Sequence, residues 1–131
     1  MTNNDLAQFD HQKYLSIETY RKSGQGVATP VWFAESDDGL MYIYTLPDAG
    51  KVKRIRNNPK VRVAPCDMRG RITGDWVEGT ARVEDEDGAR LGQRLLNQKY
   101  WTKRVGDFFS RLAGRKQAVI SVRVSWITNQ E

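Results

Sequence analysis

Alternation of apolar and polar residues predicts β-strands along the first third of the chain. Two strands are expected over Tyr14–Tyr20 and Gly26–Glu35, joined by a tight turn, and a third over Leu40–Leu46 after another turn. Because side chains in a strand alternate with a period of two, Tyr42 and Tyr44 should share one face of the third strand. We therefore expect an antiparallel meander with an aromatic face.

The second half of the chain predicts three more strands, over Val61–Ala64, Gly74–Val83 and Ala118–Val124. Apolar residues three or four positions apart predict helices in four other segments. These are Asn4–Gln12, Lys51–Asn58, Gly88–Tyr100 and Thr102–Leu112.

The order of these elements predicts a mainly β fold. The connections between strands are short, so the six strands should be mostly antiparallel, and closing them into a small barrel leaves no unpaired edge. One helix follows the third strand, and two lie between the fifth and the sixth. We expect a single domain over residues 1–131, in which a helical arm (residues 1–12) docks on a barrel (residues 14–127).

Composition is typical of an ordinary soluble globular domain, with 39% hydrophobic and 28% charged residues in a chain of 131. No apolar run approaches the roughly 18 residues that span a bilayer, and the first ten residues do not resemble a secretory signal. Cys66 and His11 are the only cysteine and histidine, so neither an internal disulfide nor a Cys/His metal site is expected. We expect a half-buried core thiol, a surface histidine and a cytoplasmic protein.

Charge is distributed unevenly in this chain, whose formal net charge is +5. No acidic residue lies between Asp48 and Asp67, whereas six basic residues do. A helix N-terminus with basic residues favours an anion, and Thr45 adds a hydroxyl before it, so this segment is suited to a phosphate group. Ordinary solvated helix charge is the alternative. The six are Lys51, Lys53, Arg54, Arg56, Lys60 and Arg62.

Common nucleotide and metal motifs are absent from the sequence, but an ordered set of other segments resembles a known family. The segments are Gly26-Val-Ala-Thr-Pro-Val-Trp-Phe33, Tyr44-Thr45, Gly50-Lys-Val-Lys-Arg-Ile-Arg-Asn-Asn-Pro59, Val61-Arg-Val-Ala-Pro-Cys-Asp-Met-Arg-Gly70 and Val77-Glu-Gly-Thr-Ala-Arg82. In this order they resemble the split-barrel flavin-binding superfamily. The closest group is the pyridoxamine 5′-phosphate oxidase class of oxidoreductases that use the deazaflavin coenzyme F420. The resemblance extends from about Tyr14 to Val124.

This resemblance implies a six-stranded antiparallel split β-barrel that forms a homodimer, with two cofactor sites at the subunit interface. It places one group of residues beside the tricyclic ring, a second near the phosphate and a third near the ring or the ribityl chain. These groups are Thr29, Pro30, Val31 and Trp32; Tyr44, Thr45, Lys51, Lys53 and Arg54; and Pro65 and Cys66. Structural roles remain alternatives: Pro30 can protect a barrel edge, and Trp32 and Tyr44 can pack against other protein groups.

The function implied is hydride transfer between reduced F420 and a small conjugated organic substrate, with an FMN-dependent oxidoreductase as the alternative. The C-terminal residues Ser125–Glu131 lack the Arg-Leu-Ala-Pro-like ending of true pyridoxamine 5′-phosphate oxidases, so vitamin B6 oxidation is not expected. A barrel that binds a cofactor such as haem without turnover, or one that binds single-stranded nucleic acid, is a further alternative. Four basic residues are candidates for contacts to the acidic F420 tail: Arg56, Lys60, Arg69 and Arg71.

Overall fold

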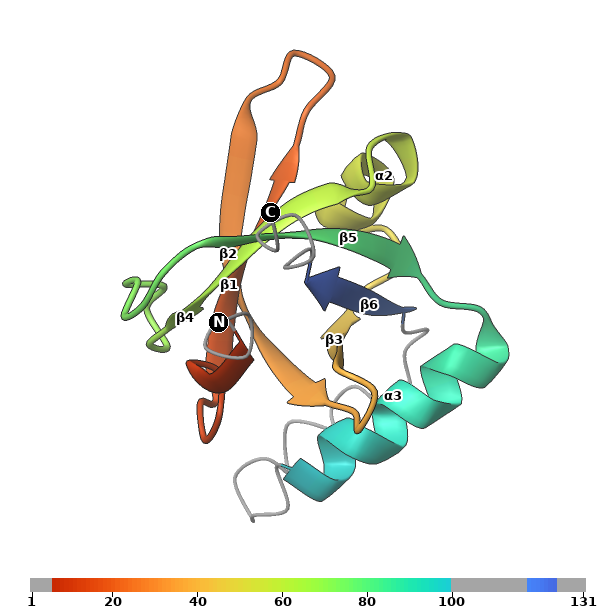
Figure 1. Cartoon of the computed structure of the whole chain (residues 1–131). Helices are drawn as coiled ribbons and strands as arrows, with labels where there is room; N and C mark the ends of the chain where they lie inside the picture. Colours follow the sequence, from red (N-terminus) through yellow and green to blue (C-terminus); the bar gives the residue numbers. More distant parts are fainter. Residues whose placement is uncertain (1–5, 100–117, 125–131) are drawn as a thin grey trace, which may run out of the picture.

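Six antiparallel strands form a closed barrel in the computed structural model, which describes residues 6–99 and 118–124 (Figure 1). Their order around the barrel is β1-β2-β3-β6-β5-β4. This confirms the predicted split-barrel class. The strands are β1 (Tyr14–Tyr20), β2 (Gly26–Glu35), β3 (Leu40–Thr45), β4 (Lys60–Cys66), β5 (Val77–Val83) and β6 (Ala118–Val124).

Strand β1 lies between β2 and β4 and sets which of their residues share a face. Leu15 pairs with Val31 on one side and with Pro65 on the other. Leu15 is fully buried and Val31 packs against the same core, so this row faces the barrel interior. Alternation along the strands then turns the neighbouring row outward. That second row consists of Trp32, Tyr14 and Cys66.

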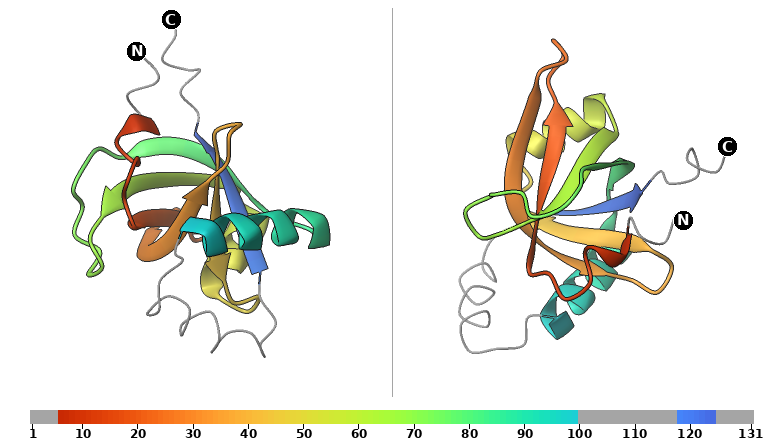
Figure 2. Two further views of the ribbon diagram at one scale, coloured as in Figure 1. Left: turned by 90° about the horizontal axis from the view of Figure 1, so that it is seen from below. Right: turned by 60° about the vertical axis from the view of Figure 1, so that its left-hand side comes forward.

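Both ends of the barrel are filled by apolar side chains from outside the sheet. Helix α2 (Gly50–Asn57) packs near β1 and β5 and buries Val52 and Ile55 in the core. Phe9 is fully buried and meets Phe33 edge-on, with 5.9 Å between ring centroids. Figure 2 shows α2 and the N-terminal segment at opposite ends of the barrel.

The predicted helix over Asn4–Gln12 ends earlier than expected, and positions 4 and 5 lie outside the described residues. Residues 6 and 7 are helical and a turn follows, in which Phe9 N–H donates to Leu6 C=O and Gln12 N–H to Phe9 C=O. His11 then adopts a φ of 63°, which a helix cannot continue. Burial of Phe9 fixes the position of the turn against the barrel.

Strands β4 and β5 differ in length from their predicted bounds. β4 continues past Ala64 to Cys66, because Pro65 and Cys66 pair with β1. β5 begins at Val77 rather than Gly74, and its pairing with β4 stops at Val63. The intervening residues form a hairpin over residues 67–72 and a short connection.

Helix α3 (Glu86–Lys99) covers the outer face of β2, β3 and β6 (Figure 1). Its first turn contains Glu86 and Asp87, where the helix dipole favours negative charge. Gly92 is buried where the helix lies closest to the sheet. The predicted helix Thr102–Leu112 lies outside the described residues, as do the ends of the arm and barrel ranges.

Candidate functional site

The start of helix α2 is a point of concentrated positive charge. Ala49 precedes the helix in an extended conformation and makes no side-chain capping hydrogen bond, and the first turn contains no acidic residue. The partial positive charge of the helix N-terminus is therefore not neutralised by a side chain of its own first turn. Lys51 and Arg54 lie on this short helix and are both partly buried.

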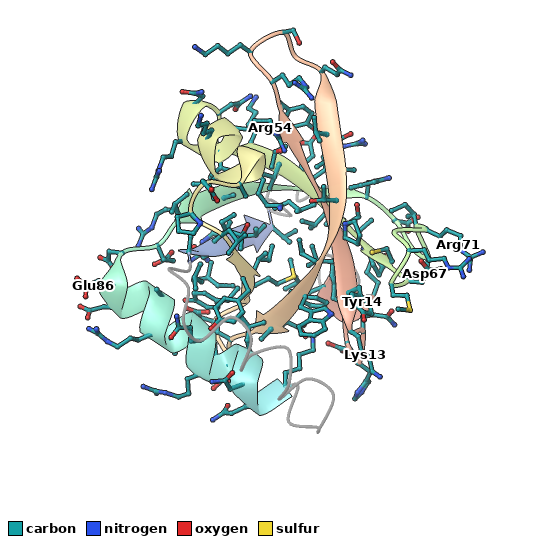
Figure 3. All side chains as sticks on the ribbon, turned by 180° about the vertical axis from the view of Figure 1, so that it is seen from behind. Lys13, Tyr14, Arg54, Asp67, Arg71 and Glu86 are labelled. Carbon is teal, nitrogen blue, oxygen red and sulfur yellow. The ribbon has the colours of Figure 1, made fainter. Side chains whose placement is uncertain are left out.

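Arg54 is held against strand β1 by a hydrogen bond. Its Nε donates to Thr19 Oγ1 at 2.6 Å, and Thr19 is fully buried. Figure 3 shows Arg54 between α2 and the β1–β2 hairpin. Gly50 makes room for it, because a Cβ atom there would lie 2.7 Å from Arg54 Nη1.

Positively charged side chains lie close together at the start of α2 and repel one another. Burial lowers the pKa of Lys51, and the charge of Arg54 lowers it further. Burial likewise lowers the pKa of Arg54, to which the charge of Arg21 adds. An anion bound among these three groups would relieve their repulsion, so the arrangement favours a phosphate. We call Lys51, Arg54 and Arg21 the cationic corner.

Lys53, which the resemblance paired with Lys51, lies elsewhere on the helix surface. Its side chain is exposed, while Lys51 and Arg54 are both partly buried. Positions three apart on a helix share a side, whereas positions two apart do not. The structure therefore brings Lys51 and Arg54 together and leaves Lys53 apart.

The four β2 residues expected beside a cofactor ring face two directions. Val31 packs against the barrel core, and Thr29 pairs with the buried Ile17, so these two side chains lie on the inner face. Pro30 is exposed and Trp32 partly exposed, and both lie on the outer face. Only Pro30 and Trp32 can offer side chains to a ring outside the barrel.

Trp32 and Tyr44 pack against the same small cluster, which includes Leu96 of helix α3. Both pack with Ala34 and Leu96 in a small outer cluster. Burial raises the pKa of the Tyr44 hydroxyl. Trp32 also faces Tyr14, with ring centroids 6.3 Å apart. Protein packing thus accounts for part of the surface of both residues, while each keeps some exposure.

Pro65, Cys66 and Thr45 lie at the ends of their strands. Pro65 is buried beside Leu15 on the inner face, and Cys66 is 3% exposed on the outer face next to Tyr14. Burial raises the pKa of the Cys66 thiol, and the nearby carboxylate of Asp67 raises it further, which favours the unreactive thiol over the thiolate. Thr45 pairs with Ala118 at the last position of β3, just before the loop to α2.

Comparison with known proteins connects this geometry to a family. The chain matches the sequence profile of the family described as pyridoxamine 5′-phosphate oxidase over residues 1–131. The chain belongs to this family. No relative was found in a comparison with curated protein sequences.

Solved structures of similar fold include members with different described roles. The conserved hypothetical protein Rv2991 of Mycobacterium tuberculosis is 17% identical, with a TM-score of 0.69 over 94% of this chain and 79% of that one. A candidate pyridoxamine 5′-phosphate oxidase of Listeria innocua is 16% identical (TM-score 0.65; 95% and 93% covered). HutZ, a haem storage protein of Vibrio cholerae, is 14% identical (TM-score 0.66; 94% and 87% covered). At these identities the likeness shows the fold alone.

The residues of this pyridoxamine 5′-phosphate oxidase family member fit a cofactor that carries a phosphate. Lys51 and Arg54 supply fixed positive charge at an uncapped helix start, and Gly50 leaves space beside the guanidinium. Within residues 6–99 and 118–124, no cluster of three His, Cys, Asp or Glu side chains could hold a metal ion. No helix in the same part of the chain is long and apolar enough to cross a membrane.

Thr19, the hydrogen-bond partner of Arg54, and Arg21, whose charge acts on Arg54, were not among the residues that the sequence pointed to. Thr19 comes from β1 and Arg21 from the turn that follows it, more than 25 positions before α2 in the sequence. No local motif links them to the helix, since only the closure of the barrel brings β1 beside α2. The signal available in the sequence was the polar Thr19 at a position where alternation predicts a buried side chain.

The four residues expected to bind an acidic cofactor tail fall into two groups. Lys60 begins β4 next to the end of α2, where Arg56 also lies, whereas Arg69 and Arg71 lie on the hairpin beyond the other end of β4. Arg71 is moreover paired with Asp67, its Nε lying 2.8 Å from Oδ2 (Figure 3). A seven-residue strand separates the groups by about 20 Å, so they do not form one site.

Proposed function

We propose that this protein is a cofactor-dependent oxidoreductase that binds F420 and transfers a hydride between the reduced cofactor and a small conjugated organic substrate. The cationic corner carries this proposal. It joins a side-chain guanidinium, a half-buried ammonium and an uncapped helix N-terminus in one place, which is the arrangement that a phosphate ester needs. FMN is the alternative cofactor, because it presents the same phosphate.

The outer face of β1, β2 and β4 is the proposed wall for the cofactor ring. Trp32, Tyr14 and Cys66 form one row there, and the exposed Pro30 lies beside the 67–72 hairpin. A wall on one side leaves the other side of a planar ring open, and a second copy of the chain would close it. We therefore propose a homodimer with two equivalent sites at the interface.

The cofactor would supply the hydride chemistry, and the residues of the chain would bind and orient it. Arg54 and Lys51 would fix the phosphate end, which sets where the ring lies along the outer face. Burial of Cys66 keeps its thiol protonated, so it would serve as a packing surface rather than a nucleophile. The single free cysteine suits a reducing, cytoplasmic location.

The preference for F420 over FMN rests on the positive charge at the other end of α2. Arg56 and Lys60 are exposed at the far end of α2 and at the start of β4, so they can meet the carboxylates of an oligoglutamate tail. Contacts between exposed charges are screened by salt. Tight F420 binding that weakens with added salt more than FMN binding does would support this preference.

Parallel fluorescence titrations with F420 and FMN test the proposal. Lys51→Ala and Arg54→Ala should each weaken binding of the preferred cofactor about tenfold or more, since each removes a charged hydrogen bond to the phosphate. Lys53→Ala is the matched control, because it removes an exposed charge from the same helix, and it should change the affinity less than about threefold.

Three results would count against the proposal. Binding of neither cofactor would remove the oxidoreductase assignment, and binding of haem instead would favour a storage role. Equal losses in all three variants would show a diffuse charge effect rather than a phosphate site at the corner.

A further inference from the structure

We propose that Thr19 is a positioning residue, which orients the guanidinium of Arg54 so that both of its terminal nitrogens face a phosphate. This inference rests on the proposed function, because it assigns a role within the proposed phosphate site. Thr19 lies on β1, which no sequence motif connects with cofactor binding, and it would act on the ligand only through Arg54.

The contact between the two side chains is specific in both partners. Arg54 Nε donates to Thr19 Oγ1 at 2.6 Å, and Thr19 is fully buried, so close packing surrounds the acceptor. An arginine has five N–H donors, of which one is on Nε. Using that one for Thr19 leaves the four donors of Nη1 and Nη2 available, in the fork that binds two phosphate oxygens at once.

Gly50 leaves the space that the same guanidinium occupies. A Cβ atom at position 50 would lie 2.7 Å from Nη1 and 3.5 Å from Cζ of Arg54, which is closer than non-bonded atoms approach. Nη1 therefore lies directly against the first residue of α2. The guanidinium is fixed at its Nε by Thr19 and adjoins the helix N-terminus at its Nη1, so a phosphate at that terminus would meet both donors together.

Orientation matters here because the neighbouring charges repel the guanidinium. The charge of Arg21 acts on Arg54, and the charge of Arg54 acts in turn on Lys51. A long arginine side chain beside two cations gains by turning away into solvent, and holding it in place loses rotamer freedom. The hydrogen bond to Thr19 opposes that motion before the ligand arrives, which is how preorganisation raises affinity.

The test compares each cofactor with its phosphate-free form, so that the phosphate contribution is measured separately from ring binding. The probes are FMN against riboflavin and F420 against its phosphate-free deazaflavin chromophore. The ratio of dissociation constants within a pair reports the phosphate site. Thr19→Val removes the acceptor but keeps the side-chain volume, and Thr19→Ser keeps the acceptor.

In Thr19→Val, the preference for the phosphorylated form should fall about fivefold to tenfold, with binding of the phosphate-free form unchanged. Thr19→Ser should restore most of the preference. Gly50→Ala is an independent variant that displaces Arg54 from the other side, and it should also reduce the ratio. Circular dichroism and the midpoint of thermal unfolding verify that each variant is folded.

The possible results distinguish a failure of this inference from a failure of the proposed function. If the wild-type protein binds both members of each pair equally, or binds none of them, the phosphate site itself is wrong. If the wild type prefers the phosphorylated form and Thr19→Val retains that preference, the role of Thr19 is wrong. An equal loss for both members of a pair would likewise overturn it, because a purely structural defect does not discriminate between them.

Discussion

Lys99, the last described residue of α3, carries its charge in a half-buried position on the barrel. Its Nζ lies 3.5 Å from the centroid of the Phe33 ring. Burial lowers its pKa to about 8, against the opposing influence of the Glu35 and Asp10 carboxylates. Burial raises the pKa of Glu35 as well. The folded state thus holds an ammonium where its charged form is disfavoured.

Stability should therefore rise with pH through the range in which Lys99 loses its proton. Its pKa is about 8 in the folded protein and near 10.5 when unfolded, so above about pH 8 the unfolded state binds more protons and folding is relatively favoured. In urea unfolding from about pH 7.5 to about pH 9, the wild type should gain stability relative to Lys99→Met. This window stays below the titration of the buried tyrosines.

Parallel pH profiles for the wild type and Lys99→Met would contradict this expectation. A contribution from Cys66 does not confuse the comparison, because its raised pKa affects both proteins equally. The difference between the two profiles isolates the lysine.

Residue-level roles were only partly predictable from the sequence. The basic run after β3 identified Lys51 and Arg54 as candidates, together with Lys53. In the structure Lys53 lies on a different side of the helix from the other two. Which residues share a side depends on the residue at which the helix begins and on the side that it buries. The partner of Arg54 is 35 positions away along the chain. Such a contact follows from barrel closure and not from any local pattern.

At the scale of elements, the approach of α3 to the sheet depends on Gly92. A Cβ atom there would lie 2.6 Å from Val119 Cγ1 and 3.1 Å from Tyr42 Cδ1. Val119 is fully buried on β6, and Tyr42 is 4% exposed on β3. Neither side chain can withdraw without opening the packing beneath the helix.

Gly92→Ala should therefore destabilise the protein although alanine is the better helix former. Alanine gains about 1 kcal/mol in helix propensity, while overpacking a rigid site costs about 1 to 3 kcal/mol. We expect a net loss of about 1 kcal/mol in urea unfolding. Asn97→Ala, at an exposed position of the same helix, is the control and should leave stability equal or slightly raised.

A double-mutant cycle with Val119→Ala tests the stated cause. The second substitution opens a cavity by itself, but it should also accommodate the new methyl group, so that the double variant is more stable than the sum of the single effects indicates. Additive losses would mean that Gly92 acts through something other than the Val119 contact.

Strands were more predictable than the segments that join them. Alternating residues gave β1, β2 and β6 their bounds, because one side of each strand lies in the core. β4 was predicted too short because Pro65 normally marks the end of a strand. It is tolerated because β4 there pairs with β1 only, the pairing with β5 having ended at Val63.

The N-terminal arm shows the limit of helical spacing as a signal. Leu6 and Phe9 are three positions apart, which fits an α-helix and equally fits a turn with i to i+3 hydrogen bonds. The structure has helical residues at positions 6 and 7 and the turn after them. Docking was correctly predicted nonetheless, because burial of Phe9 is favourable in either conformation.

At the scale of the whole molecule, ion pairs neutralise some of the basic side chains. Several arginines of the described residues have carboxylate partners: Arg62 with Glu18, Arg71 with Asp67, Arg82 with Glu84, and Arg90 with Glu86 and Asp87. A nucleic-acid surface requires basic groups free to meet phosphates along a continuous path. The paired arginines therefore favour a single anion site over a basic groove.

The hairpin between β4 and β5 exposes apolar side chains on the side of the molecule away from the start of α3 (Figure 3). Met68 is 70% exposed and Ile72 is 40% exposed, and Gly70 between them lies beside Pro30 of β2. This hairpin adjoins the outer row of Tyr14, Trp32 and Cys66 that we propose as the cofactor wall. A partner copy seated there would cover both the apolar residues and the open side of the ring.

Replacing Met68 by aspartate should accordingly dissociate the proposed homodimer and weaken cofactor binding together. Light scattering after size exclusion should give twice the chain mass of 15.0 kDa for the wild type and a shift toward one chain mass for Met68→Asp. Leu91→Asp is the matched control, since Leu91 is 36% exposed on α3 and outside this face, and it should remain dimeric. If Met68→Asp became monomeric with unchanged cofactor affinity, the site would lie within one subunit. A wild-type monomer would mean that the face is open to solvent and that one chain alone must hold both sides of the ring.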